Sequence, residues 1–262
     1  MSTGALKEMP RFFGANRELF GLFHPGAPDA PHAVLLCPPL GQDQIRCHRL
    51  YRQLAQALAA EGVPALRFDY YGSGDSAGDS AGLDWNRCVD DAMEAANELR
   101  RHSGVDRVVA FGARLGASIA ITAATEARFA GIVAWDPVLE GGSHVARLDA
   151  LQEALRTDSS RFMASRTAAD IAGQWQGFAI SDRLRRQLLE LYVEPPAVPL
   201  LVVDTQPDRV ARSWRHTVGD EAQVVRLQSA TPWDELERME VAILSQPVIR
   251  AVTGHLKEVA HA

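Results

Sequence analysis

An arginine between two glycines occupies the most distinctive chemical setting in this chain. The apolar run from Val108 predicts a buried strand, which leads into Gly112-Ala113-Arg114-Leu115-Gly116 and then into an alanine-rich helix. In the Gly-x-Ser-x-Gly form of this strand–turn–helix, a sharp turn lifts a nucleophilic serine above the sheet, and the glycines admit the crowded backbone. A guanidinium stays protonated and cannot attack a carbonyl carbon. Either the protein does not perform ordinary ester hydrolysis or its nucleophile lies elsewhere.

Two roles are open for Arg114. In the first, it joins the helix dipole and the backbone N–H groups of Leu115 and Gly116 in a receptor for a carboxylate or phosphate. Leu40 or Gly41 in the facing loop can add donors, because the two prolines before them have no N–H group. In the second, Arg114 closes an internal salt bridge with Asp208 or Asp136, since a buried arginine needs an anion.

Other side chains could in principle replace the missing serine. The turn at Gly112–Gly116 is here called the elbow. Ser118 lies one helical turn beyond it, where a small packed helix residue is expected. Cys37 ends a predicted strand, and a thiol at such a position is usually buried and inert. Cys47 and His48 are adjacent at a helix start, where neighbouring side chains point apart. None of these residues is preferred as a nucleophile.

The elements that must position this turn alternate between strand and helix. Such alternation predicts an α/β fold, a mostly parallel sheet of about eight strands with helices on both faces. Strands are expected at 11–13, 18–24, 33–37, 63–69, from 108, and at 131–136, 198–204 and 223–227. Helices are expected at about 48–61, 83–101, 208–216 and 236–259.

Between about residues 138 and 194 the sequence shows no strand pattern. Helical segments are expected there around 143–156, 168–175 and 181–192. Pro195-Pro196 follows them, and the next expected element is a strand. An all-helical insertion at this point would form a lid over the active-site face. The predicted organisation is a core of residues 1–137 and 197–262 with a helical cap at 138–196.

Four ordered motifs carry a resemblance over nearly the whole chain. They are the glycine-rich run 66–79, the elbow at 112–117, Trp135-Asp136-Pro137-Val138 and Pro232-Trp233. Together they resemble the α/β-hydrolase superfamily, in a branch similar to exosortase A system-associated hydrolases and serine aminopeptidase-like proteins. The resemblance implies the α/β-hydrolase fold, hydrolase activity and a setting beside bacterial exopolysaccharide or natural-product genes.

The same resemblance indicates where a catalytic acid and histidine would lie. Acids in this superfamily usually follow the sixth or seventh strand, where Asp136 and Asp208 stand; the N-cap of the next helix is the alternative role for Asp208. The histidine should follow the last strand, but residues 228–235 contain none. His216 and His255 are expected to be surface residues. The nucleophile and base of a Ser-His-Asp triad are therefore missing.

Composition restricts the class of protein. A formal charge of −6 on 262 residues argues against a general nucleic-acid binder. Three widely spaced cysteines predict reduced thiols, with no disulfide framework or metal site. No leader-like or membrane-spanning run is present, which favours a cytoplasmic protein without membrane insertion. No cofactor is indicated, and a homo-oligomer is possible.

Three hypotheses follow. The first is an atypical α/β-hydrolase-fold enzyme that processes an acyl, ester or anionic intermediate, small or carrier-bound, with Arg114 positioning it and Asp208 or Asp136 as base or orienter. The second is a non-catalytic ligand-binding or scaffold pseudo-hydrolase. The third is a conventional serine hydrolase with a misplaced nucleophile.

Overall fold

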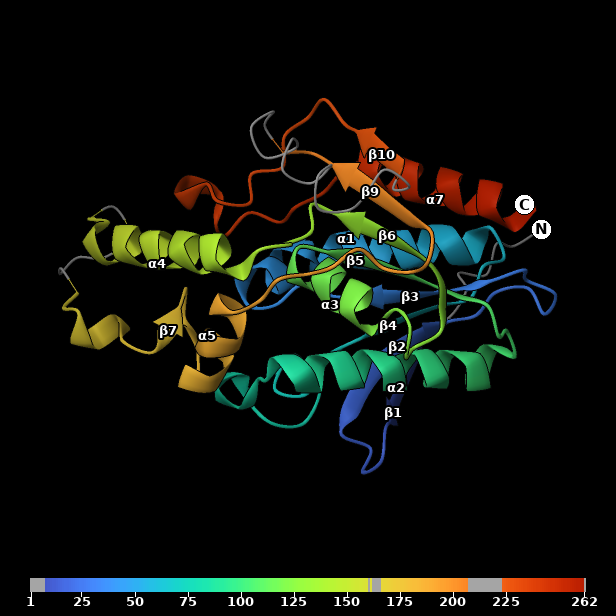
Figure 1. The fold of residues 1–262 in the computed structure, drawn as a ribbon, viewed down its shortest axis with the longest axis horizontal. Coiled ribbons are helices and arrows are strands. Elements are labelled where there is room, and N and C mark those ends of the chain that lie inside the picture. The colour runs from blue at the N-terminus through green and yellow to red at the C-terminus, as the bar shows by residue number, and fades with distance from the viewer. Residues whose placement is uncertain (1–7, 160, 162–165, 207–222, 262) are drawn as a thin grey trace.

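Eight strands form one twisted sheet in the computed structural model, which describes residues 8–159, 161, 166–206 and 223–261 (Figure 1). The strands are β1 (Met9–Phe13), β2 (Leu19–His24), β3 (Ala33–Cys37), β4 (Ala65–Phe68), β5 (Val108–Ala113), β6 (Phe129–Trp135), β9 (Leu200–Asp204) and β10 (Gln223–Arg226). Their order is β1-β2-β4-β3-β5-β6-β9-β10. β2 pairs antiparallel with β1 and β4, and all other pairs are parallel. The predicted fold class is confirmed.

Helices cover both faces of this sheet, as expected. α1 (Gln42–Ala60) and α7 (Gln246–His261) pack on one face, and α2 (Trp85–Ser103) and α3 (Leu115–Ala123) pack on the other. A short 3-10 helix, η1 (Ser80–Gly82), precedes α2. Every residue of β3, β4 and β5 is buried, because a central parallel strand is covered on both sides. This rigid centre carries the elbow.

Two helices differ in extent from their predictions. α1 begins at Gln42, about six residues early, because Gly41 turns the chain with a φ of 61° immediately before it. α7 begins at Gln246, about ten residues late, and Ser245 Oγ accepts a hydrogen bond from the Val248 N–H at its start. The segment before α7 contains only a 3-10 turn, η3 (Leu236–Arg238). The helix expected at 208–216 lies outside the described residues.

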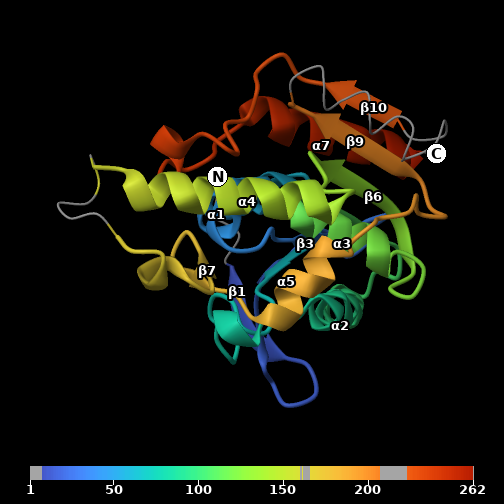
Figure 2. The same cartoon turned by 60° about the vertical axis from the view of Figure 1, so that its left-hand side comes forward.

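Residues 138–196, here called the cap segment, lie at the carboxyl ends of the parallel strands. The segment contains α4 (Gly141–Thr157), η2 (Ala169–Ile171), β7 (Gln174–Trp175), β8 (Phe178–Ala179) and α5 (Asp182–Leu189). Its two ends meet in an antiparallel bridge between Glu140 and Tyr192. Figure 2 shows α4 above β7 and α5 on the side that faces the viewer.

The prediction that this insertion is all-helical is wrong for residues 168–179. That stretch forms the 3-10 turn η2 and then the antiparallel pair β7–β8. The two residues between these strands, Gln176 and Gly177, have φ angles of 54° and 90°. Positive φ at both loop positions is the geometry of the tight turns that suit two-residue hairpins.

His24, at the end of β2, predicts a pH dependence of stability. Its side chain is buried, and its Nε2 accepts a hydrogen bond of 3.2 Å from Arg67 Nε. Burial and then the Arg67 charge lower the pKa of His24 to about 4. Because the unfolded histidine has a pKa of about 6.5, the unfolded chain binds this proton first. Stability therefore falls as pH drops from about 6.5 to 4, by up to about 1.4 kcal/mol per pH unit from this residue.

The change His24→Gln keeps an acceptor for Arg67 and removes the titration. Urea unfolding at pH 7, 6, 5 and 4.5 should give a shallower loss of stability for the variant than for the unchanged protein. Equal slopes over this range would show that His24 is not the titrating group.

Candidate functional site

The elbow at Arg114 has the backbone geometry that its glycines predict. Arg114 lies between β5 and α3 with φ 52° and ψ −127°, and its N–H donates to the Trp135 carbonyl over 3.0 Å. A Cβ atom on Gly112 would lie 2.5 Å from the Ala117 nitrogen, and one on Gly116 would lie 2.3 Å from the Pro38 oxygen. Both positions therefore require glycine. A positive φ at a non-glycine residue is costly and is characteristic of functional turns.

The Arg114 side chain is buried among charged and aromatic groups. Only 4% of it is exposed; its Nε is 3.5 Å from Asp43 Oδ2, and its Nη2 is 3.6 Å from Asp234 Oδ1. The guanidinium lies 5.3 Å from the centre of the Trp233 ring, and Nη2 lies 3.5 Å from His144 Nδ1. Nε makes no hydrogen bond to any residue that the structure describes. Arg114 thus closes an internal salt bridge, with Asp43 and Asp234 as its partners.

Asp136 has a different role from the one expected, because it does not pair with Arg114. It follows β6 with a φ of 44° and is fully buried. Its carboxylate accepts hydrogen bonds from the Thr205 N–H (2.8 Å) and hydroxyl, from Gln206 Nε2 (3.0 Å) and from Trp233 Nε1 (2.7 Å). Burial raises the pKa of Asp136, and these donors oppose that rise. Four donors satisfy the group without a cation.

Trp233 occupies the segment after the last strand, where a catalytic histidine was expected. Its indole N–H donates to Asp136, and its ring lies against the Arg114 guanidinium. Trp233 therefore contacts both Arg114 at the elbow and Asp136 after β6. An indole N–H is a donor only and cannot take a proton from a nucleophile. Asp208 and His216 lie outside the described residues, and His255 lies on α7.

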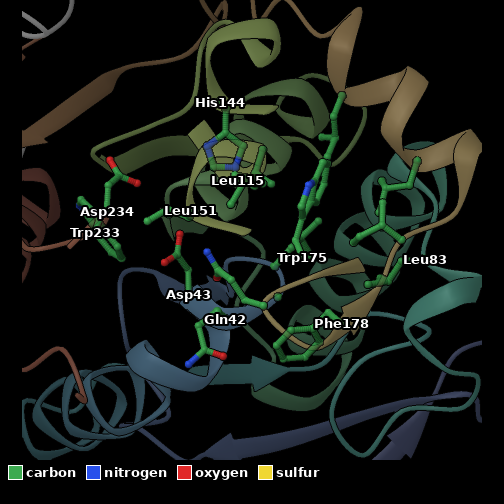
Figure 3. Close-up of a pocket in the computed structure, with 17 residues that line it drawn as sticks. Gln42, Asp43, Leu83, Leu115, His144, Leu151, Trp175, Phe178, Trp233 and Asp234 are labelled. Atoms are coloured by element: carbon green, nitrogen blue, oxygen red, sulfur yellow. The ribbon is translucent and has the colours of Figure 1, made fainter. Parts of the chain in front are cut away.

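A cavity opens between this cluster and the cap segment (Figure 3). About 640 Å³ of space between the side chains that border it is free of protein atoms, open solvent included. Asp43, Asp234, Trp233 and His144 border one side of it, and Arg114 lies behind these side chains. Figure 3 shows Trp175, Phe178 and Leu83 on the opposite side, which Leu184 and Leu188 of α5 extend. The cavity therefore has one polar and one apolar wall.

The predicted oxyanion residues separate into two groups. Leu40, Gly41 and Leu115 border the cavity, whereas Gly116 packs beneath it against the backbone of Cys37 and Pro38. The first three therefore lie at the surface of the cavity.

Asp43 and His144 are the cavity groups with displaced pKa values. Burial raises the pKa of Asp43, and the nearby Arg114 charge opposes the rise. Burial, Arg114 and Arg147 hold the pKa of His144 well below its usual value, so its imidazole is neutral at pH 7. Because Arg114 can only donate, His144 Nδ1 accepts and its proton is on Nε2. The cavity thus contains a perturbed carboxyl beside a neutral imidazole.

Sequence reasoning missed Asp43, His144 and Asp234. A signal existed for Asp43, which follows Gly41 of the facing loop by two residues and lies in the first turn of α1. Asp234 stands next to Trp233 in a motif that was noticed, but it was not assigned a role. His144 comes from α4 of the cap segment, and no local pattern connects that helix to the elbow.

The alternative nucleophiles occupy the structural roles expected of them. Ser118 is fully buried, and its Oγ donates to the carbonyls of Val138 (2.5 Å) and Arg114 (3.2 Å). Burial raises the pKa of the Cys37 thiol to about 12, which makes it a poor nucleophile. Cys47 is buried as well. In the described part of the chain, no group of three or more His, Cys, Asp or Glu residues could hold a metal ion. None of the helices described there is long and apolar enough to cross a membrane.

Residues 45–176 match the sequence family described as serine aminopeptidase, S33. The chain belongs to this family. No curated protein sequence matches it. The family is described by the words serine aminopeptidase, whereas this member has Arg114 at the elbow.

Solved structures share the fold of this S33 family member at low sequence identity. The esterase PF2001 of Pyrococcus furiosus has a TM-score of 0.66 at 14% identity, covering 96% of this chain and 90% of the other. Est1E of Butyrivibrio proteoclasticus, solved with ferulic acid, has a TM-score of 0.63 at 15% identity, covering 92% and 94%. XC6422 of Xanthomonas campestris, a serine hydrolase without a lid, has a TM-score of 0.53 at 18% identity, covering 87% and 85%. The α/β-hydrolase fold is therefore shown.

Proposed function

We propose that this α/β hydrolase takes an acyl-type ligand into the cavity beneath the cap segment and processes it without a serine nucleophile. The observation that carries the proposal is the two-sided cavity, which has an apolar wall from the cap and a polar wall organised by Arg114. Among the described residues that border it, none is a serine, threonine or cysteine. The pathway expected from the resemblance, exopolysaccharide or natural-product synthesis, stays a prediction, as does a cytoplasmic location.

The apolar wall suits a hydrocarbon chain or ring. Trp175, Phe178, Leu184 and Leu188 present side chains with no charge to this space. Burying apolar ligand surface against them contributes about 25 cal/mol per Å² before the costs of association.

The polar wall suits an uncharged carbonyl, as in an ester or thioester. Arg114 is already paired with Asp43 and Asp234, so a free anion would have to displace one of these carboxylates. A carbonyl oxygen can instead accept from the N–H groups of Leu115 and Gly41. Asp43, with its raised pKa, is the group placed to give or take a proton. In this proposal Arg114 is a positioning residue that acts through Asp43 and Asp234.

Binding without turnover is the second candidate function. The observation that favours it is the ion pair between Asp43 and Arg114, because a carboxylate held by a guanidinium is a weaker base than an unpaired one. Turnover of an acyl thioester that is abolished by Asp43→Asn would favour the enzyme, whereas ligand binding with no turnover would favour the binder.

A thermal-shift titration with the thioester octanoyl-N-acetylcysteamine tests the proposal. At about 100 times its dissociation constant, a ligand of this site should stabilise the protein by about 2.7 kcal/mol. Leu184→Ala removes part of the apolar wall and should reduce this shift, relative to the variant's own ligand-free melting temperature. Leu189→Ala is the matched control, because Leu189 is an exposed residue of the same helix. No shift with the thioester in any of the three proteins would overturn the acyl-ligand proposal.

A further inference from the structure

A second cavity adjoins the first at its glutamine-lined edge. Gln42 and Gln176 border both cavities, so the two spaces are neighbours beneath the cap segment. About 840 Å³ between the side chains that border the second cavity is free of protein atoms, open solvent included. The two cavities therefore meet at a shared edge formed by these two glutamines.

Arginines dominate the charged groups that border this second cavity. They are Arg156 at the end of α4, with Arg161 and Arg166 after it; among the described residues that border the cavity, Glu240 is the one carboxylate. This set is here called the arginine cavity. It contrasts with the first cavity, where the bordering charged side chains are carboxylates.

The ion pairs with Glu153 and Glu240 are exposed on the carboxylate side, whereas the pair of Arg161 with Asp158 is mostly buried. Arg156 and Arg161 are 27% and 21% exposed, whereas their partners Glu153 and Glu240 are 58% and 81% exposed. Exposed ion pairs typically contribute about 0–1 kcal/mol, so an incoming anion displaces such a carboxylate at little cost. Arg161 also pairs with Asp158, which does not border the cavity.

Backbone contacts hold these two guanidiniums in place. Arg161 Nη2 donates to the Leu236 carbonyl over 2.7 Å, and Arg156 Nη1 donates to the Arg166 carbonyl over 3.2 Å. A guanidinium fixed in this way loses less freedom when it binds an anion. Arginine groups are well suited to phosphate because they donate two parallel hydrogen bonds to it.

We propose that the arginine cavity binds a phosphate group and that the ligand is an acyl chain joined to this phosphate by a flexible arm. The inference rests on the proposed function, since the acyl part must occupy the first cavity. An acyl thioester of a phosphorylated pantetheine has this chemistry, whether free as coenzyme A or attached to a carrier protein. The Gln42–Gln176 edge would then surround the arm between the thioester and the phosphate.

Two thioesters that differ only in the phosphate test the inference. We expect octanoyl-4′-phosphopantetheine to bind about tenfold more tightly than octanoyl-pantetheine by calorimetric titration at low salt, because charge-assisted hydrogen bonds to phosphate are the stronger kind. This gain should be lost in the double variant Arg156→Gln/Arg161→Gln, and it should fall as salt rises. Arg238→Gln, which removes an exposed arginine outside both cavities, should retain it.

The outcomes separate the two proposals. Octanoyl-pantetheine binding equally well to the unchanged protein and to the double variant, with no gain from the phosphate, would overturn the arginine cavity alone. No binding of either thioester would overturn the acyl proposal and this inference together. If octanoyl-coenzyme A binds as tightly as octanoyl-4′-phosphopantetheine and no more tightly, the protein contacts only the phosphate that the two share. This result supports an arm attached to a carrier protein. A larger gain with coenzyme A supports the phosphate and adds contact with the free nucleotide.

Discussion

Gly116→Ala is expected to cost about 4 kcal/mol or more of folding stability and to lower the melting temperature by roughly 10 °C. An alanine Cβ at this position would lie 2.3 Å from the Pro38 oxygen and 2.4 Å from the Cys37 oxygen. Both are backbone atoms, one in the last residue of β3 and one in the residue after it, so neither can move away as a flexible side chain would. Circular dichroism during heating and urea unfolding would measure the loss.

Gly254→Ala is the matched control, because it changes another helical glycine in the same way. Gly254 lies in α7, where an added Cβ meets nothing within 4 Å. Alanine is a better helix former, so this variant should be more stable by about 0.5–1 kcal/mol. If both changes shift the melting temperature by the same amount and in the same direction, the close contact at the elbow is not the cause.

Arg114→Met is expected to cost about 3 kcal/mol at pH 8. Removal of the guanidinium leaves Asp43 and Asp234 without their shared buried cation, and loss of one partner of a buried ion pair typically costs about 3–5 kcal/mol. The lower end applies because Asp234 is partly exposed and keeps its ion pair with Arg147. Asp43 likewise keeps one with Arg46 at 3.8 Å. Arg147→Met is the control: Arg147 also pairs with Asp234 but is 34% exposed, so its loss should cost about 1 kcal/mol or less.

The stability loss of Arg114→Met should depend on pH. Burial raises the pKa of Asp43, and removal of Arg114 would raise it further. A folded carboxyl with a raised pKa binds its proton before the unfolded one, so the deficit of the variant should shrink as pH falls from 8 to 5. Adding Asp43→Asn to Arg114→Met should restore part of the stability. Additive effects of the two changes in urea unfolding would contradict the ion pair.

The sheet could be predicted because its signals are local. The apolar runs of β3, β5 and β6 alternate with helical patterns, and this rhythm alone gives the order of strand and helix. The β7–β8 hairpin was missed because a helical period and a short hairpin are hard to separate over a few residues. Its marker was Gln176-Gly177, a two-residue loop in which both residues take positive φ.

The site was predictable only where backbone geometry determines the residue type. Gly112 and Gly116 mark the elbow because no side chain fits there. The partners of Arg114 depend on how distant segments meet, so spacing could not separate Asp136 from Asp43 as a partner. In the structure, Asp136 instead accepts hydrogen bonds from Thr205, Gln206 and Trp233. Trp233 was recognised as a motif, but its contacts to both Asp136 and Arg114 could not be inferred from spacing.

Labelling with a fluorophosphonate probe most directly tests the central claim that this family member does not use a serine nucleophile. Intact-mass analysis of the native protein after incubation, with an active serine esterase treated in parallel, would measure the adduct. The buried cluster of Arg114, Trp233 and Asp136, with an indole where a base would stand, predicts an unchanged mass. A stoichiometric adduct on a serine of the folded protein would contradict the account.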